Sequence, residues 1–238
     1  MKVFITAEIG INHGRSTQRA INLIRQAKEA GADAVKFQLW QPDTFPHLEN
    51  YRFDFEQLKY TKEFAESLEI EWFCTPFDVV SAQLLSSTDM NIWKIPSNRA
   101  VWENESLLDY IVDRCKNWGC QVFVSTGCCT FSQLQNLFRK LEVLDDVVVF
   151  HCVSEYPTKP ERSNLSVLKG MMVGNKNVGY SDHTGLIEIP VAAVGMGATA
   201  IECHITLDKQ DGLDGIVSYE PGEFKKMVQM IRRVEVAI

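Results

Sequence analysis

The sequence has little that would mark a membrane, secreted or nucleic-acid-binding protein. No apolar run approaches the roughly 20 residues that a membrane-spanning helix needs. The amino-terminal stretch MKVFITAEIG reaches Glu8 before the apolar region of a signal peptide could form. Acidic residues outnumber basic ones, and the net charge of −7 argues against broad binding to nucleic acids or anionic membranes. A local cationic pocket for a small anion is still compatible with this charge.

Paired cysteines and nucleotide-binding loops are also missing. The seven cysteines are odd in number and none forms a C-x-x-C pair, so we expect reduced thiols in a cytoplasmic protein. Neither the G-x-G-x-x-G turn of dinucleotide-binding folds nor the G-x-x-x-x-G-K-[ST] loop of nucleotide triphosphate sites occurs. No low-complexity linker divides the chain, which predicts one domain over residues 1–238.

Short apolar runs alternate along the chain with amphipathic stretches. The runs are nearly continuous in hydrophobicity, as expected for parallel strands that are buried on both faces. They occupy Val3–Ile9, Ala34–Gln38, Glu71–Thr75, Ile92–Ile95, Gln121–Thr126, Val147–Val153, Asn177–Ser181 and Ala200–Ile205. Eight such strands alternating with helices predict a (β/α)₈ TIM barrel of the α/β class. A doubly wound open sheet is the alternative, but it usually has fewer strands and the glycine-rich turn that is missing here.

Helices are predicted between these runs from apolar periodicity and capping residues. Ser16 or Thr17 caps the first helix, which Gly31 ends, Asn104 caps a later one, and Pro221 opens the last. The other predicted helices cover Phe53–Leu68, Val79–Ser86, Thr130–Leu141, Asn164–Lys169 and Ile187–Met196.

Polar residues gather where the predicted strands end, which is where barrel enzymes place their chemistry. In chain order they are Glu8, Asn12, His13, Lys36, Gln38, Thr75, Asp78, Lys94, Ser97, Ser125, Thr126, His151, Ser154, Tyr156, Ser181, Asp182, His183, Glu202 and His204. Four of the five histidines belong to this set, and only His47 lies elsewhere. Because the strands of a barrel converge on one rim, we expect these side chains to form one site.

Two lysines of this set, Lys36 and Lys94, lie in apolar strands. Burying them without anionic partners would cost several kcal/mol each, so they need carboxylates or a bound anion. With the neighbouring hydroxyls they form a candidate site for a phosphate or carboxylate. Glu8 is the best candidate for proton transfer because it ends a buried strand, and a salt bridge to one of the lysines is its alternative role.

Two histidines, His183 and His204, end neighbouring strands and are candidate ligands of a divalent metal. Imidazoles without a thiolate suit Mn²⁺, Fe²⁺, Co²⁺ or Zn²⁺, and structural hydrogen bonding is the alternative. Asp182 and Glu202 are the candidate partners that fix the imidazole tautomers.

In several of its segments the chain resembles the sialic acid synthase family, which includes related nonulosonate and spore-coat polysaccharide synthases. The most specific segments are GYSDHTG and, some twenty residues later, E-x-H-x-T-L-D. The similar segments are AEIGINHG (7–14), AGADAVKFQ (30–38), CTPFD (74–78), KIPS (94–97), STG (125–127), HCVSEYPT (151–158), GYSDHTG (179–185), GATAIECHITLD (197–208) and SYEP (218–221).

This resemblance implies an enzyme that condenses phosphoenolpyruvate with an aldehyde sugar, releases phosphate and forms a nonulosonate-type 2-keto acid. Glu8, His183 and His204 would be catalytic, and the two histidines would hold a divalent metal, Mn²⁺ first, with Mg²⁺ or Co²⁺ as alternatives. Tyr156 and Asp214 would line the side of the acceptor sugar. The substrate-binding residues would be Lys36, Gln38, Thr75, Lys94, Ser97, Arg99, Ser125, Ser154, Tyr156, Ser181 and Asp214.

Several departures from the family pattern fall on the acceptor side. Arg99 stands where the family has an acidic contact to the sugar, Ser154 replaces a common asparagine, and Gly215 replaces the histidine of G-P-D-H. The segment 39–52 is short, and the chain ends where the family continues into a small antifreeze-like domain. We therefore expect an N-acylmannosamine-like or an altered, anionic acceptor, and a homodimer or a separate chain that supplies the lid.

Two other functions fit the same residues. A Schiff-base or metal-dependent aldolase or lyase would use Lys36 or Lys94 as its amine, and borohydride trapping would favour it, whereas loss of activity with a chelator would favour the synthase. A non-catalytic ligand-binding subunit would bind the phosphorylated ligand tightly without releasing phosphate.

Overall fold

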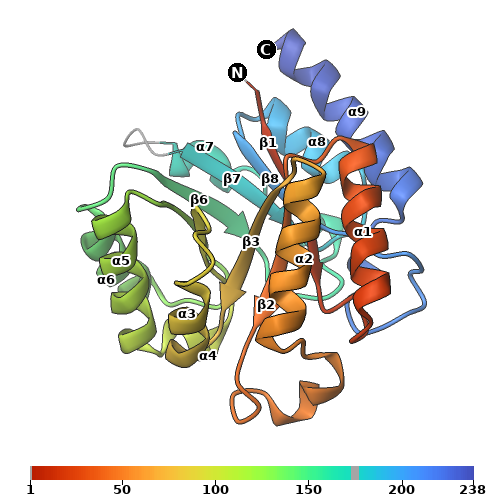
Figure 1. Ribbon diagram of the computed structural model, residues 1–238. Coiled ribbons are helices and arrows are strands. Elements are labelled where there is room, and N and C mark those ends of the chain that lie inside the picture. Colours follow the sequence, from red (N-terminus) through yellow and green to blue (C-terminus); the bar gives the residue numbers. More distant parts are fainter. Residues whose placement is uncertain (1, 173–176) are drawn as a thin grey trace.

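A curved sheet of eight parallel strands forms the centre of the molecule in the computed structural model, which describes residues 2–172 and 177–238 (Figure 1). The strands are β1 (Phe4–Gly10), β2 (Ala34–Leu39), β3 (Glu71–Pro76), β4 (Ile92–Ile95), β5 (Gln121–Ser125), β6 (Val147–Cys152), β7 (Asn177–Asp182) and β8 (Ala200–His204). Their order is β3-β2-β1-β8-β7-β6-β5-β4. β3 and β4 pack beside each other at the seam, where the described residues form no hydrogen-bonded ladder. The predicted (β/α)₈ barrel is confirmed.

The strand register brings the polar residues of neighbouring strands to one level. Glu8 on β1 is the Cα partner of Lys36 on β2 and of His204 on β8, and Ser181 on β7 is the partner of Glu202 on β8. Paired residues of parallel strands have side chains on the same face of the sheet. The register therefore assembles acidic, basic and imidazole groups from separate strands inside one end of the barrel.

Helices cover the outside of the sheet, each predicted one close to its expected place. The α-helices are α1 (Thr17–Ala30), α2 (Phe55–Ser67), α3 (Val79–Leu85), α4 (Arg99–Trp102), α5 (Glu105–Trp118), α6 (Phe131–Leu141), α7 (Val167–Met171), α8 (Glu188–Gly195) and α9 (Pro221–Ala237). The 3₁₀ helices are η1 (Pro46–Tyr51), η2 (Pro160–Arg162) and η3 (Gly215–Val217). The Ser16 side chain caps α1 by accepting a hydrogen bond from the Arg19 amide. Gly31 ends the helix in the left-handed conformation, at φ +93°, which glycine adopts readily because it has no Cβ.

Some helix boundaries differ from the prediction for local reasons. α2 begins at Phe55 because Asp54 and Gln57 form a capping box in front of it. α7 begins later than predicted because Asn164 adopts φ +44°, which a right-handed helix cannot include. The four-residue α4 was not predicted, since a single turn shows no apolar periodicity.

The two ends of the chain meet at the amino-terminal end of the barrel. Asp33, between α1 and β2, accepts hydrogen bonds from the Ile5 amide (2.9 Å) and from Arg232 on α9 (2.7 Å). Arg232 also donates to the Val3 carbonyl (2.6 Å) and pairs with Glu235 (2.6 Å). α9 packs against α1 and α8, so this ion-pair network joins the first strand to the last helix.

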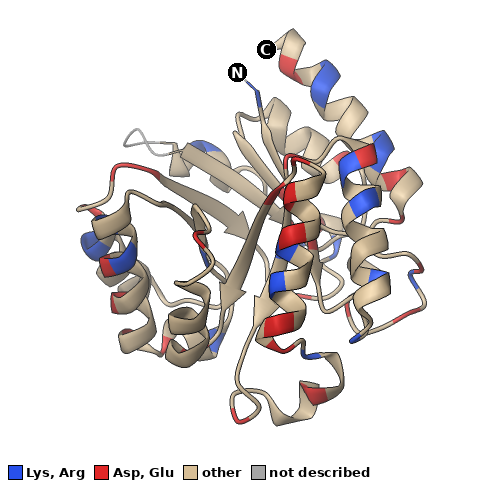
Figure 2. Ribbon diagram, viewed as in Figure 1, with Lys and Arg blue, Asp and Glu red and all other residues tan. Residues whose placement is uncertain are grey.

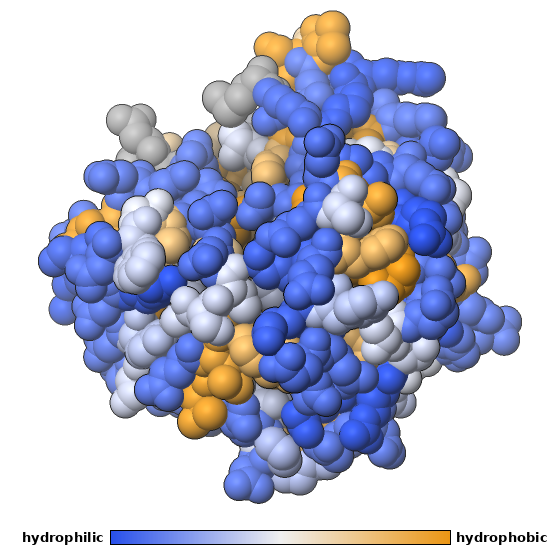
Figure 3. All heavy atoms as spheres, viewed as in Figure 1, coloured by the Kyte–Doolittle hydropathy of each residue, from blue (hydrophilic) through white to orange (hydrophobic). Residues whose placement is uncertain are grey.

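The outer surface is polar. Figure 2 shows residues of both charges along α1, α2 and α9, and Figure 3 shows a mostly hydrophilic face on which apolar patches are scattered. No helix within the described part of the chain is long and apolar enough to cross a membrane.

Candidate active site

A cavity of about 340 Å³ opens at the carboxyl ends of the strands. The floor of the cavity is polar and is formed by the strands. One side is apolar and is formed mainly by the segment after β2, with Phe77 from the segment after β3. The residues that line it are Glu8, Ile11, Lys36, Gln38, Trp40, Phe45, His47, Leu48, Phe77, Lys94, Pro96, Ser97, Asn98, Ser125, Cys152, Tyr156, Ser181, His183, Glu202, His204, Leu213 and Asp214.

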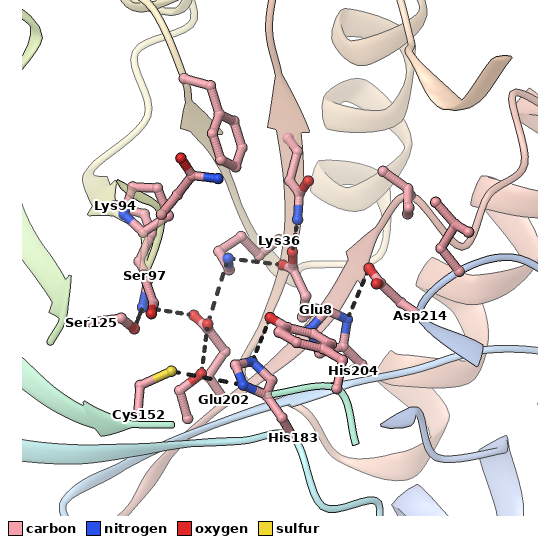
Figure 4. A pocket seen from close by; sticks show the side chains of 18 of the residues that line it. Glu8, Lys36, Lys94, Ser97, Ser125, Cys152, His183, Glu202, His204 and Asp214 are labelled. Atoms are coloured by element: carbon pink, nitrogen blue, oxygen red, sulfur yellow. Dashed lines mark hydrogen bonds and ion pairs between the residues drawn. The ribbon is translucent and has the colours of Figure 1, made fainter. Parts of the chain in front are cut away.

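Two lysines and two glutamates form the floor of the cavity (Figure 4). Lys36 Nζ lies 3.0 Å from Glu8 Oε2 and 3.5 Å from Glu202 Oε1, and Lys94 Nζ lies 3.1 Å from Glu202 Oε2. Lys94 also donates to Ser125 Oγ (2.7 Å). All four charged residues are buried. The lysines have the carboxylate partners that they were expected to need, and Glu8 forms the salt bridge that was the alternative to its role in proton transfer.

The two carboxylates have opposite pKa shifts. Burial raises the pKa of Glu8 to about 7, although Lys36 opposes the shift, and the charge of Glu202 adds to it. Burial would raise the pKa of Glu202 as well, but Lys36 and Lys94 together outweigh it and lower that pKa to about 2. Glu202 is therefore a fixed negative charge, whereas Glu8 can exchange a proton near neutral pH.

Hydroxyl and amide groups surround the charged floor. Ser181 Oγ donates to Glu202 Oε1 (3.2 Å), and Thr75 Oγ1 lies 3.3 Å from Lys36 Nζ, behind the cavity wall. Ser97 lines the cavity and hydrogen-bonds Ser154, which lies behind it. Gln38 Nε2 donates to Glu8 Oε1 (2.7 Å). These predicted residues thus lie in the floor or directly contact it.

The two histidines lie side by side, with ring centroids 5.5 Å apart. His183 Nδ1 donates to the Val153 carbonyl (2.7 Å), which leaves Nε2 facing the Tyr156 hydroxyl (2.8 Å). Burial would lower the pKa of His183, but the Cys152 thiol and the Val153 carbonyl raise it to about 9. Burial and nearby positive charge hold the pKa of His204 well below its usual value, so its ring is neutral.

The tautomer partners predicted for these histidines were wrong. Glu202 pairs with the lysines, and Asp182 accepts from Tyr219 Oη (2.7 Å) and Thr184 Oγ1 (2.8 Å) on the far side of β7. The backbone carbonyl of Val153 orients His183 instead.

A divalent metal fits between the histidines. His204 Nδ1 is buried and has no hydrogen-bond partner among the described residues; the nearest charge is Asp214 Oδ2, 3.7 Å away. A bound cation would take the place of the proton on His183. No group of three or more His, Cys, Asp or Glu in the described part of the chain is arranged to hold a metal ion, so the protein would supply two imidazoles and leave the other positions to water or substrate.

Arg99 does not reach the cavity. Its side chain is 81% exposed at the start of α4 and pairs with Glu103 (2.7 Å), one turn along the same helix. The position of Arg99 in the sequence suggested a contact to the acceptor, but the short helix directs the guanidinium to solvent. Arg99 therefore gives no support for an anionic acceptor.

The apolar side of the cavity was missed by the sequence analysis. Trp40, Phe45, His47 and Phe77 contact one another edge to face, with ring centroids 5.3–6.2 Å apart. His47 was placed outside the site because it lies on no strand. The only signal in the sequence was the number of aromatic residues between β2 and α2.

The other polar residues at strand ends have structural roles. His13 stacks on Phe53 with centroids 3.6 Å apart; His151 hydrogen-bonds the Ser163 carbonyl (2.8 Å); and Asp78 caps α3 through the Ser81 amide (2.8 Å).

The fold and the site together define a class: a (β/α)₈ barrel with buried lysines and glutamates beside two imidazoles at the carboxyl ends of its strands. A model of the NeuB family matches residues 43–238. The chain is 34% identical to N,N'-diacetyllegionaminic acid synthase of Legionella pneumophila, covering 100% of this chain and 74% of that one. It is 30% identical to human N-acetylneuraminate-9-phosphate synthase, covering 99% and 71%.

A solved structure agrees with these relatives. The crystal structure of N-acetylneuraminic acid (sialic acid) synthetase from Leptospira borgpetersenii in complex with citrate matches 100% of this chain and 85% of its own, at 31% identity and a TM-score of 0.91. The chain therefore belongs to the NeuB family of synthases, and the expected resemblance is confirmed.

Proposed function

We propose that the protein condenses phosphoenolpyruvate with an aldehyde sugar to form a nonulosonate-type 2-keto acid and phosphate. The observation that carries the proposal is the buried floor of the cavity, where Lys36 and Lys94 lie within 3.5 Å of carboxylates and beside two imidazoles. Relatives whose names state this kind of product match 99–100% of this chain in sequence, and the solved synthetase structure matches it with a TM-score of 0.91.

Phosphoenolpyruvate would bind on this floor through its two anionic ends. Lys36, Lys94 and the hydroxyls of Ser97, Ser125 and Ser181 offer donors to its phosphate and carboxylate. The site is buried, so these charges act with little screening by water and stabilise the negative charge that moves during the reaction.

His183 and His204 would hold a divalent ion, Mn²⁺ first, with Mg²⁺ or Co²⁺ as alternatives. When it is bound, such an ion supplies Lewis acidity that polarises the aldehyde carbonyl. Tyr156 and Asp214 lie next to the two rings and would hold the acceptor sugar there.

The reaction forms one carbon–carbon bond and breaks one carbon–oxygen bond. C3 of phosphoenolpyruvate attacks the aldehyde carbon, and the aldehyde oxygen becomes a hydroxyl. The carboxylate of Glu8 stabilises the positive charge that develops at C2 and accepts a proton from the water that attacks there. The C2–O bond to phosphate then breaks, phosphate leaves with the bonding electrons, and the 2-keto group forms. The two protons of the water end on the new hydroxyl and on phosphate.

A Schiff-base lyase is the second candidate, and Lys94 is the residue that would carry it. Burial lowers the pKa of Lys94, which favours a neutral amine, although the charge of Glu202 opposes the shift. Lys36 is unsuited to this role because Glu202 and Glu8 outweigh burial and raise its pKa.

Release of phosphate from phosphoenolpyruvate tests the proposal. We expect release that requires both an aldose and Mn²⁺, that is lost in His183→Ala, and that is retained in Phe131→Ala, an exposed position outside the cavity. Cleavage that persists with a chelator, together with borohydride trapping of a carbonyl compound on Lys94, would instead establish the lyase.

A further inference from the structure

One side of the cavity is built for an apolar group. This aromatic wall consists of Trp40, Phe45, His47 and Phe77; Phe45 is at its centre, with ring centroids 6.0 Å from Trp40, 6.2 Å from His47 and 5.3 Å from Phe77. Leu48, Ile11 and Leu213 extend the apolar lining. Phosphoenolpyruvate, with an anionic group at each end, belongs on the charged floor, so the wall faces the space left for the second substrate.

The cavity offers no lysine or arginine for a phosphate on that second substrate. The lysines and arginines among the described residues that line it are Lys36 and Lys94, which both lie in the floor and are paired with carboxylates. Four arginines at this end of the barrel are paired as well: Arg19 with Asp211, Arg52 with Glu49, Arg99 with Glu103 and Arg162 with Glu155. Arg15, on the loop after β1, is exposed and does not line the cavity.

The acceptor side carries negative charge instead. Asp214 lines the cavity next to His204, with its carboxylate 3.7 Å from the ring. A phosphate ester beside this carboxylate and the aromatic wall would lose its water without gaining a cation, which disfavours its binding.

Sequence identity does not decide whether the acceptor is phosphorylated. Relatives at similar identity include synthases whose names specify a 9-phosphate product and synthases whose names specify none. We infer that this protein uses an unphosphorylated sugar and binds an apolar substituent of it against the aromatic wall. The inference rests on the proposed function and names the class of its second substrate.

The substrate panel that tests this inference varies charge and apolar size separately. It contains an N-acetylated hexosamine, the same sugar as its 6-phosphate ester, the same sugar with a longer N-acyl chain, and the parent hexose without the acyl group. We expect the phosphate ester to have a kcat/KM at least about tenfold lower than the uncharged sugar, and removal of the acyl group to raise the acceptor KM by about tenfold.

A matched pair of variants assigns the effect to the wall. Phe45→Ala should raise the acceptor KM by about tenfold and leave the KM of phosphoenolpyruvate within twofold, since the ring contacts of Phe45 are with Trp40, His47 and Phe77. Phe131→Ala removes an equal side chain that is 75% exposed and does not line the cavity, so both KM values should match those of the wild type. The panel on the wild-type enzyme gives the result even if Phe45→Ala does not fold.

The outcomes separate this inference from the proposed function. No release of phosphate with any sugar would overturn the proposed function and the inference with it. Release that is equal or faster with the 6-phosphate ester would overturn the inference alone, and its loss in His47→Ala would then place the phosphate on that exposed imidazole. An acceptor KM that is unchanged both by removal of the acyl group and by Phe45→Ala would also contradict the inference that the wall binds this substituent.

Discussion

At the scale of single residues, the floor of the cavity shows how one lysine serves two carboxylates differently. Lys36 lies 3.0 Å from Glu8 and 3.5 Å from Glu202, but Glu202 has Lys94 as a second cation. Burial therefore prevails at Glu8, whose pKa rises to about 7, and the two lysines prevail at Glu202, whose pKa falls to about 2. Two residues of the same type thus have separate roles, proton exchange and fixed charge.

Glu8→Gln should lower kcat by about 100-fold or more, because it removes the group that accepts a proton in the proposed mechanism. In the wild-type enzyme kcat/KM should rise with pH through about 7 as Glu8 loses its proton. This rise in kcat/KM should be absent from the variant, and measurement of kcat/KM against pH for both enzymes checks it. A variant that keeps the same rise would show that another group titrates.

The pH dependence of stability should also differ between the wild type and Glu8→Gln. The folded-state pKa of Glu8, about 7, lies above its ordinary value of 4.5, so the stabilisation from the protonated form is complete below pH 4.5 and is lost as the pH rises to about 7. The loss should reach about 3 kcal/mol at most. Urea unfolding between pH 4.5 and 7.5 gives the free energy of unfolding of both proteins. The difference between the wild type and Glu8→Gln should narrow or reverse as the pH rises through this range.

Glu202→Gln should destabilise the protein without substrate by roughly 3–5 kcal/mol, because it leaves two buried lysines short of a counter-charge. Its shift is opposite to that of Glu8, so the contribution of Glu202 is present above pH 4.5 and is lost as the pH falls toward 2. An anion in the floor should replace the missing charge. Inorganic phosphate should therefore raise the Tm of Glu202→Gln more than that of the wild type; equal increases would mean that anions do not bind beside the lysines.

Much of this floor could be predicted from the sequence, because a barrel brings the ends of all its strands to one rim. Glu8, Lys36, Lys94 and the two histidines were found in that way. The partner of each charge could not be predicted: Glu202 was assigned to an imidazole and binds lysines. A strand register decides such pairings, and the sequence does not contain it explicitly.

At the scale of elements, the segment between β2 and α2 carries three residues of the aromatic wall, and the Asp78 side chain anchors the part of it that precedes Phe45. Asp78 Oδ2 accepts hydrogen bonds from the Gln41 amide (2.8 Å) and from Thr44 Oγ1 (2.9 Å). Its other oxygen caps α3 through the Ser81 amide (2.8 Å). One carboxylate therefore fixes both a helix terminus and the loop that leads to Phe45.

Asp78→Ala should cost about 1–2 kcal/mol of stability through the lost cap and should raise the acceptor KM several-fold by loosening the wall. The KM of phosphoenolpyruvate should stay near the wild-type value, because the floor is built by strands. Thermal unfolding and steady-state kinetics check the two effects. Ser16→Ala, which removes the cap of α1 and changes no residue of the cavity lining, should have a comparable stability cost and no effect on the acceptor KM.

Element prediction succeeded where periodicity and caps agree, as for α1 between Ser16 and Gly31. It failed for the segment after β2, whose order depends on contacts with Asp78 and Phe77 rather than on a repeating pattern. The aromatic wall could therefore not be seen in the sequence: Trp40, Phe45 and His47 lie only a few positions apart, but Phe77 joins them from the segment after β3.

At the scale of the whole molecule, the barrel separates its chemistry from the contacts that close it. The cavity lies at the carboxyl ends of the strands, whereas Asp33, Arg232 and Glu235 join β1 to α9 at the amino ends. Arg232 contacts the backbone of Val3 as well. This network is partly exposed, so its ion pairs are weaker than those in the floor.

Arg232→Met should therefore lower the free energy of unfolding by about 1–3 kcal/mol, since it removes a donor from the part-buried Asp33 carboxylate and from the Val3 carbonyl. Its kcat and both KM values should match the wild type, because no residue of the network lines the cavity. Arg232 and Glu202 have no partner in common among the described residues, so the destabilisation in Arg232→Met and in Glu202→Gln should add within about 0.5 kcal/mol in the double variant. Urea unfolding of the four proteins measures this sum. A coupling larger than that would mean that closure of the barrel at its amino end also sets the geometry of the charged floor.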